Sequence, residues 1–319
     1  MTLPEPGPEL AGRLVAAERG WQPISIRRFT TGSGHYVYEA VSETEALVVR
    51  FELPERTAAL AAGSALMRRL AGLGVLLPRL LGTGSVDGFP YQLMDRLPGT
   101  DLGHVIGTLD DGQLAAIAGH VARAQQDTAR LGTGNRFGYA VTTEAAPHET
   151  WFGVLDAHLE RSRQRMSAAG LFDLAVLDPV ASRLAAMRPA LEPQPATPFL
   201  HDTTTKNVLI DAGRFAGIVD VDDLCWGDPR WAPALTLAVL KGYGGPQRYV
   251  GHWMTAADHA EDDTFGLYVA LFLLDLMAEH GHVFNGNQSA STPEARAGLQ
   301  RALNEALQAF QPSTVAAAR

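Results

Sequence analysis

Cysteine is almost absent from this sequence, which contains one residue of this type, Cys225. A single cysteine excludes an intramolecular disulfide framework and fits a reducing cytoplasm. Long apolar runs are also lacking: the longest, 265–278, is too short for a membrane span and contains Asp275. The first residues have neither the basic nor the apolar region of a signal peptide. We therefore expect a cytoplasmic protein that has no membrane partner.

Positive charge is scarce and unusual in kind. The formal net charge is −9, and no basic cluster is dense enough to hold a nucleic-acid backbone. We therefore expect no nucleic-acid partner. Lysine occurs only as Lys206 and Lys241, so almost every role that needs a cation falls to arginine. With 46% hydrophobic and 19% charged residues, the 319-residue chain has ordinary globular composition and room for two lobes that share a cleft.

The hydrophobic pattern changes near Pro98-Gly99, from mainly strand-like to mainly helical. Before this point the pattern predicts strands at 24–29, 35–41, 46–51, 79–84 and 91–96 and helices at 9–19 and 56–73. After it, helices are expected at 111–131, 150–168, 176–191, 229–241, 246–259, 263–281 and 293–311, a hairpin at 208–219 and a loop at 132–148. This predicts an α+β fold with a lobe at 1–97, a second lobe at 98–312 and a mobile tail at 313–319.

Asp202 and Asn207 stand five residues apart in one short loop, and Asp220 follows across the expected hairpin. Phosphoryl transfer from a nucleotide requires a carboxylate to orient or deprotonate the acceptor, and oxygen ligands for magnesium. These three side chains are of those types. A pair of turn-capping residues would also explain the first two. Coincidence is less convincing when Leu200-His201-Asp202, Asn207-Val-Leu-Ile, Gly217-Ile-Val-Asp220 and Gly227-Asp228-Pro229 occur in that order.

With these motifs the sequence resembles the aminoglycoside phosphotransferase family, the small-molecule branch of the protein-kinase-like fold. The resemblance implies a bilobal fold in which Asp202 is the catalytic aspartate and Asn207 and Asp220 bind magnesium. Leu200 and His201 depart from the family's usual His-Gly before the aspartate, and Val221 replaces a usual tryptophan. These departures leave the base and the metal ligands in place, and they leave the substrate open.

The resemblance also implies a nucleotide site in the first lobe. Gly32, Ser33 and Gly34 would form the turn that covers the phosphates, although a full kinase loop would carry a third glycine where Val37 stands. By themselves these residues equally fit an ordinary hairpin turn. Arg50 aligns with the strand lysine that holds the α- and β-phosphates. Met94 and Leu97 belong to the expected hinge beside the purine.

Arg50 lacks its usual partner in the sequence. The resemblance places a glutamate on the following helix, around Gly63 or Ser64, and no acidic residue stands there. Glu52 or Glu55 would be substitutes. This missing ion pair is the strongest sequence argument for altered or lost activity.

Further contacts are expected in the second lobe. Lys206 would neutralise the transferring phosphate, although a solvated loop lysine is the commoner case. Asp222 would contact metal or substrate, and Asp275 and Glu279, four residues apart on one helix face, would bind a cationic substrate. The two latter carboxylates would equally satisfy arginines of a neighbouring helix. Asp228 before Pro229 is expected to be an architectural helix cap.

Together these features predict a Mg²⁺-dependent enzyme that transfers the γ-phosphate of ATP or GTP to a hydroxyl of a small molecule. The alternative is a catalytically inactive nucleotide-binding regulatory protein of the same fold. A protein kinase is a weaker alternative, because the sequence has no Ala-Pro-Glu-like segment or long activation loop after Asp220.

Overall fold

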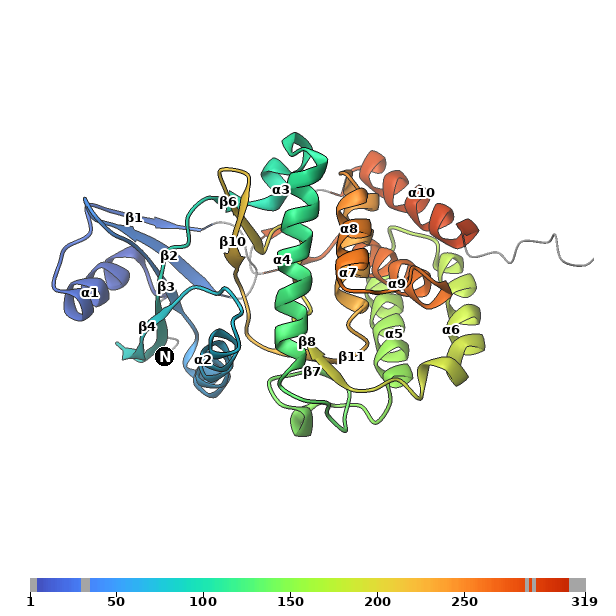
Figure 1. The fold of residues 1–319 in the computed structure, drawn as a ribbon, viewed down its shortest axis with the longest axis horizontal. Coiled ribbons are helices and arrows are strands. Elements are labelled where there is room, and N and C mark those ends of the chain that lie inside the picture. The colour runs from blue at the N-terminus through green and yellow to red at the C-terminus, as the bar shows by residue number, and fades with distance from the viewer. Residues whose placement is uncertain (1–4, 30–34, 285–286, 289–290, 310–319) are drawn as a thin grey trace, which may run out of the picture.

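We analysed a computed structural model, which describes residues 5–29, 35–284, 287–288 and 291–309. Figure 1 shows a small region built around a β-sheet beside a larger region of helices. The expected phosphate turn at 31–34 and the expected tail at 313–319 lie outside the described residues. The α+β architecture with a β-rich part before a helical part is confirmed.

The first lobe is a five-stranded antiparallel sheet flanked by two helices (Figure 1). Along the sheet the strands are ordered β1-β2-β3-β5-β4. The lobe contains α1 (Pro8–Arg19), β1 (Ser25–Arg28), β2 (Tyr36–Val41), β3 (Ala46–Phe51), the 3₁₀ turn Pro54–Arg56, α2 (Thr57–Gly72), β4 (Leu80–Val86) and β5 (Phe89–Asp95). All of these strands and both helices match elements expected from the hydrophobic pattern.

Alternation along β3 decides which side chains reach the cleft. Leu47, Val49 and Phe51 are fully buried in an apolar cluster with residues of α1. Successive strand residues point to opposite faces, so Val48 and Arg50 point to the other face. On that face Arg50 lies opposite Gln92 of β5. The strand therefore carries one arginine on the side of the sheet that faces α2 and the second lobe.

The second lobe is mainly helical, with two small three-stranded sheets. Its helices are α3 (Leu102–Val105), α4 (Asp111–Ala129), α5 (Trp151–Ala169), α6 (Asp178–Leu191), α7 (Trp231–Tyr243), α8 (Arg248–Ala256), α9 (Asp263–Glu279) and α10 (Pro293–Ala309). Its strands are β6 (Thr100–Asp101), β7 (Gly138–Ala140), β8 (Thr197–Phe199), β9 (Val208–Asp211), β10 (Arg214–Ile218), β11 (Leu224–Gly227), β12 (Val283–Phe284) and β13 (Asn287–Gln288). Short 3₁₀ turns lie at Ile106–Thr108, Thr143–Ala145 and Leu174–Leu177.

Two expectations about this lobe need correction. The segment 132–148, expected to be a loop, contains β7, whose backbone pairs with β11. Helix α7 begins at Trp231 and its cap position is Arg230, so Asp228 does not cap it. Asp228 instead accepts hydrogen bonds from the Arg230 backbone nitrogen at 3.0 Å and from the Tyr268 hydroxyl at 2.9 Å.

Helix α9 passes through the centre of the second lobe, and most of its residues are buried. In the described part of the chain, no helix is long and apolar enough to cross a membrane. The aromatic residues Tyr268 and Phe272 of α9 pack against Trp231 of α7, with ring centroids 5.2 and 3.9 Å from the Trp231 ring. The Trp151 indole donates to the Tyr268 hydroxyl at 2.7 Å, and the Trp231 indole donates to the Tyr139 hydroxyl at 2.9 Å, so both buried indole nitrogens are paired.

His158 of α5 is buried among these rings, between Trp231 and Phe272. Burial lowers its pKa from the ordinary value of 6.5 to about 4. The unfolded chain takes up a proton near pH 6.5, whereas the folded chain does so only near pH 4. The stability contributed by neutral His158 is therefore present above pH 6.5 and is lost as the pH falls towards 4.

Replacing His158 by phenylalanine is expected to flatten this pH dependence. The difference between 6.5 and about 4 corresponds to about 3 kcal/mol. Denaturant unfolding at several pH values should show that the free energy of unfolding falls less between pH 6.5 and 4 in His158→Phe than in the wild type. Phe272→Leu is the control, since it disturbs the same cluster without removing a titrating group. Equal pH slopes in wild type and His158→Phe would contradict the prediction.

Candidate active site

The loop that carries Asp202 joins β8 to β9 and is held in place by hydrogen bonds from α4. Gln125 of α4 accepts a hydrogen bond from the Leu200 backbone nitrogen at 2.9 Å and donates to the Leu200 carbonyl at 2.9 Å. The same side chain amide donates to Thr203 Oγ1 at 3.0 Å. Gln125 is buried, so both ends of its amide are satisfied by this loop. The start of the loop is thereby fixed on the helical lobe.

The three successive threonines after Asp202 are all buried and have separate contacts. Thr203 accepts from Gln125, as described above. The Thr204 hydroxyl donates to Asp202 Oδ1 at 3.1 Å, and the Thr205 carbonyl accepts from the Gly103 backbone nitrogen at 3.0 Å. The threonine run therefore anchors the loop and orients Asp202.

Asp202, Asn207 and Asp220 are brought together by hydrogen bonds between the loop and the end of β10. The Asn207 side chain donates to the Asp202 carbonyl at 2.9 Å, and the Asn207 carbonyl accepts from Val219 N at 2.9 Å. Asp220 has a φ of 61°, which is uncommon for a residue other than glycine. Such left-handed conformations cost energy and cluster at functional sites.

The side chain of Lys206, in the same loop, places a positive charge beside the Asp202 carboxylate. Lys206 Nζ lies 3.4 Å from Asp202 Oδ2, and 68% of the Lys206 side chain is exposed. An ion pair this exposed contributes little to stability. The Lys206 side chain can therefore turn towards a negatively charged group that binds beside Asp202.

Arg50 of β3 reaches across to the segment that follows β10. Its guanidinium contacts the Asp222 carboxylate and the His35 ring, and its Nη1 lies 4.0 Å from Asp220 Oδ1. His35 Nε2 lies 3.0 Å from Asp222 Oδ2, and His35 Nδ1 contacts Glu52. Burial would raise the pKa of Asp222, but the His35 hydrogen bond and the Arg50 charge lower it well below its ordinary value.

The sequence offered Glu52 or Glu55 as the partner of Arg50, and this expectation is wrong. Within residues 35–284, the acids paired with Arg50 are Asp222 and Asp220. Glu52 instead pairs with Arg56, at 3.2 Å, and contacts His35. Glu55 lies exposed on the 3₁₀ turn before α2.

His201 and Asp223 form a second pair beside the catalytic loop. His201 Nε2 lies 2.7 Å from Asp223 Oδ1, and the edge of Tyr139 packs on the His201 ring. Burial would lower the pKa of His201, but the Asp223 hydrogen bond and the nearby negative charges raise it above its ordinary value. The surroundings of the histidine that replaces a usual glycine thus favour its protonated form next to Asp202.

Asp275 and Glu279, the predicted substrate carboxylates, differ in their surroundings. Asp275 faces α5, where it accepts from Arg161 and from Ser162, both at 3.3 Å. This is the pairing with a neighbouring helix that the sequence left open. Burial raises the pKa of Glu279, and the charge of Asp275 adds to the rise. The charge of Lys206 lowers the same pKa, and the charge of Asp202 raises it.

Met94 and Leu97, the expected hinge residues, lie at and just after the end of β5. Met94 is 7% exposed and belongs to an apolar cluster that contains residues of α2 and of the second lobe. Leu97 approaches Gly217 of β10: a Cβ on Gly217 would lie 2.7 Å from Leu97 Cδ1 and 3.1 Å from the Leu76 carbonyl. With a φ of 153°, Gly217 adopts a conformation that other residues rarely reach. The glycine of the Gly-Ile-Val-Asp motif therefore permits the close contact between the lobes.

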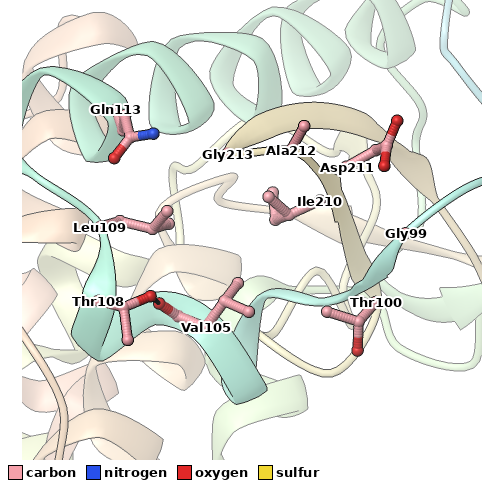
Figure 2. Close-up of a pocket in the computed structure, with 10 residues that line it drawn as sticks. All are labelled: Gly99, Thr100, Val105, Thr108, Leu109, Gln113, Ile210, Asp211, Ala212 and Gly213. Carbon is pink, nitrogen blue, oxygen red and sulfur yellow. Dashed lines mark hydrogen bonds between the residues drawn. The ribbon is translucent and has the colours of Figure 1, made fainter.

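Two adjoining hollows, with volumes of about 530 and 740 Å³, lie beside the β9–β10 turn. Figure 2 shows the first, where Val105, Leu109 and Ile210 lie close together and Gln113 of α4 lies above them. Neither hollow is lined by Asp202, Asn207 or Asp220. We assign the site to these acidic and amide groups because hydrogen bonds between the loop and the end of β10 bring together the base and the oxygen ligands that phosphoryl transfer requires.

A β-rich lobe, a helical lobe, and Asp202, Asn207 and Asp220 where the two meet define a kinase-like phosphotransferase. The chain belongs to the phosphotransferase enzyme family, whose sequence model matches residues 25–266. The resemblance seen in the motifs is thereby confirmed. Among proteins of curated function, none matches the chain in sequence.

Solved structures similar to this chain confirm the kinase-like fold. A thermostable variant of aminoglycoside phosphotransferase APH(4)-Ia is 16% identical, with a TM-score of 0.67 over 93% of this chain and 98% of that one. The same enzyme in a ternary complex with ADP and hygromycin B has equal identity and TM-score, covering 95% and 99%. A variant of aminoglycoside 2′-phosphotransferase-IIIa with GDP is 16% identical, with a TM-score of 0.61 over 95% and 96%. Identities this low concern the fold alone.

Proposed function

We propose that this protein transfers the γ-phosphate of ATP or GTP to a hydroxyl group of a small molecule and that the reaction depends on Mg²⁺. The observation that carries the proposal is the convergence of Asp202, Asn207 and Asp220 through the bonds between the loop and β10. Family membership supports the reaction class. Nucleotides bound to proteins of similar fold support a nucleotide donor.

The residues present fit a magnesium ion. Magnesium prefers oxygen ligands from carboxylates, carbonyls and water. The Asn207 amide nitrogen is used by the Asp202 carbonyl, so its Oδ1 is the atom left for a cation. The Asp220 carboxylate is 46% exposed and supplies the second oxygen ligand. When bound, the ion would neutralise charge on the nucleotide phosphates.

In the proposed reaction Asp202 orients the acceptor hydroxyl and takes its proton. A bond forms between the hydroxyl oxygen and the γ-phosphorus, and the bond from that phosphorus to the nucleoside diphosphate breaks. Arg50 holds the phosphates, and Lys206 neutralises the group in transfer. Gly32, Ser33 and Gly34 would cover the phosphates, and Met94 and Leu97 would flank the base.

For the acceptor, Glu279 is the stronger of the two predicted carboxylates. Asp275 is already bound by Arg161 of α5, whereas the pKa of Glu279 responds to the charges of Asp202 and Lys206. The related APH(4)-Ia structure contains hygromycin B. We propose that Glu279 contacts the acceptor. Phosphate transfer measured over amino sugars, amino alcohols and sugars would identify the acceptor, and transfer to none of them would favour the inactive nucleotide-binding protein.

Asp220→Asn is expected to abolish magnesium-dependent stabilisation by nucleotide. A ligand present at 100 times its dissociation constant stabilises the folded state by about 2.7 kcal/mol. Thermal unfolding with Mg-ATP and with Mg-GTP should therefore show a clear rise in melting temperature for the wild type. The rise should be lost in Asp220→Asn and in wild type treated with EDTA. If the wild type itself shows no magnesium-dependent rise, both the kinase and the nucleotide-binding proposals are wrong.

A further inference from the structure

The helix position from which the family supplies an acid to the phosphate-binding side chain is filled here by another part of the chain. Gly63 of α2 has no side chain, and the backbone of Asp222 packs directly against it. A Cβ on Gly63 would lie 3.2 Å from the Asp222 carbonyl and 3.6 Å from its Oδ1. The space that a helix side chain would occupy is therefore taken by Asp222.

The carboxylate of Asp222 is directed towards Arg50. It contacts the Arg50 guanidinium and lies 3.0 Å from His35 Nε2. Arg50 is 5% exposed. A guanidinium removed from water to this extent requires a paired acid, because an unpaired buried charge is strongly destabilising. Asp222 meets this requirement from the second lobe.

We infer that Asp222 is the acid that positions Arg50, in place of the helix glutamate that the sequence lacks. The inference deepens the proposed function and rests on it for the role of Arg50 in nucleotide binding. Asp222 is two residues beyond Asp220, so one short segment serves both the metal ligand and the phosphate-binding arginine. His35 is bound to the same carboxylate.

His35, Asp220 and Asp222 also have ligand atoms within 4.8 Å of one another, a spacing that a cation could bridge. Arg50 contacts Asp222 and lies 4.0 Å from Asp220, so a positive charge is already present there. A cation bound to Asp222 would have to replace this direct contact and would be repelled by the guanidinium. The geometry therefore favours a positioning role for Asp222 over metal binding.

Nucleotide kinetics of Asp222→Asn, Asp222→Glu and Glu55→Gln test the inference. Loss of a charged hydrogen-bond partner should lower kcat/KM for Mg-nucleotide by about 10- to 100-fold in Asp222→Asn. The KM for the acceptor and the magnesium concentration for half-maximal activity should not change. Asp222→Glu keeps the carboxylate and should recover part of the loss. Glu55→Gln, which removes an exposed acid of the first lobe, should behave as wild type.

Gly63→Glu combined with Asp222→Ala provides a sharper test by moving the acid back to α2. Asp222→Ala leaves the Asp222 carbonyl 3.2 Å from the added Cβ but removes the carboxylate oxygen at 3.6 Å, so the double variant should exceed Asp222→Ala alone in kcat/KM. In the wild-type background, Gly63→Glu should instead lower kcat/KM, because the new side chain would clash with Asp222. Thermal unfolding of each variant separates loss of function from loss of the fold.

Two kinetic results would overturn the inference. One is an Asp222→Asn protein within twofold of wild type in kcat/KM for nucleotide. The other is a raised magnesium requirement in that variant, which would make Asp222 a metal ligand. Hydrogen exchange measured without nucleotide separates failure of this inference from failure of the proposed function.

If the wild type binds no nucleotide, the proposed function fails, but faster exchange in β3 and at 218–224 of Asp222→Asn would still support the contact between Arg50 and Asp222. Unchanged exchange in that variant would contradict the contact.

Discussion

Replacing Asp202 by asparagine is expected to lower kcat for phosphoryl transfer by about 10²- to 10⁴-fold, the usual contribution of a positioned general base. Asparagine retains an oxygen that can accept from Thr204, so the loop should keep its shape. It cannot take a proton from the acceptor hydroxyl. The measurement is steady-state transfer to an acceptor found by the screen proposed above, at saturating Mg-nucleotide.

Asp211→Asn is the matched control for this variant. Asp211 is an exposed carboxylate at the end of β9, between Asn207 and Asp220 in the sequence. Its replacement should leave kcat unchanged. An Asp202→Asn enzyme within threefold of wild type would exclude Asp202 as the base. Nucleotide-induced stabilisation should survive in Asp202→Asn, and its loss would show that the variant damages the site as a whole.

Replacing Asp228 by alanine is expected to destabilise the fold by about 3 to 5 kcal/mol, the usual cost of removing one partner of a buried ion pair. Asp228 is 4% exposed and lies 2.7 Å from Arg230 Nη2. Without it the Tyr268 hydroxyl loses its acceptor, and Arg230 retains only the partly exposed Asp262 among the acids paired with it in the described residues. Denaturant unfolding followed by tryptophan fluorescence measures the loss.

Asp263→Ala is the control for this second prediction. Asp263 lies near Asp262 at the start of α9, pairs with Arg183 at 3.0 Å, and has a side chain that is 71% exposed. Pairs this exposed contribute less than about 1 kcal/mol. If both variants unfold at similar denaturant concentrations, the Asp228–Arg230 pair is not a principal support of the second lobe.

Hydrophobic periodicity was sufficient to predict most helices and the first-lobe strands. Helix α9, expected at 263–281, spans Asp263–Glu279. A long run of apolar residues bounded by polar ones is typical of a buried helix. Strand β11 was missed. All four of its residues, Leu224–Gly227, are buried, so it has no alternation to reveal it. Its partners β7 and β8 are also short, and only their pairing defines the sheet.

The candidate site was predictable where its residues are close in sequence. Asp202, Asn207 and Asp220 could be recognised from spacing and chemistry. The contact between Arg50 and Asp222 joins residues 172 positions apart and depends on how the lobes meet, which local patterns do not encode. Gln125 had a signal that went unused: it stands four residues after Val121 on the buried face of α4, where a polar side chain needs a partner.

The scarcity of lysine gives the catalytic loop a chemical consequence. Lys206 and Lys241 are the only lysines of the chain, and Lys206 is 68% exposed with its amine 3.4 Å from the Asp202 carboxylate. Reagents that acylate amines therefore have very few targets on this protein. One of those targets stands beside Asp202, so covalent labelling of the chain would report on whether that site is covered.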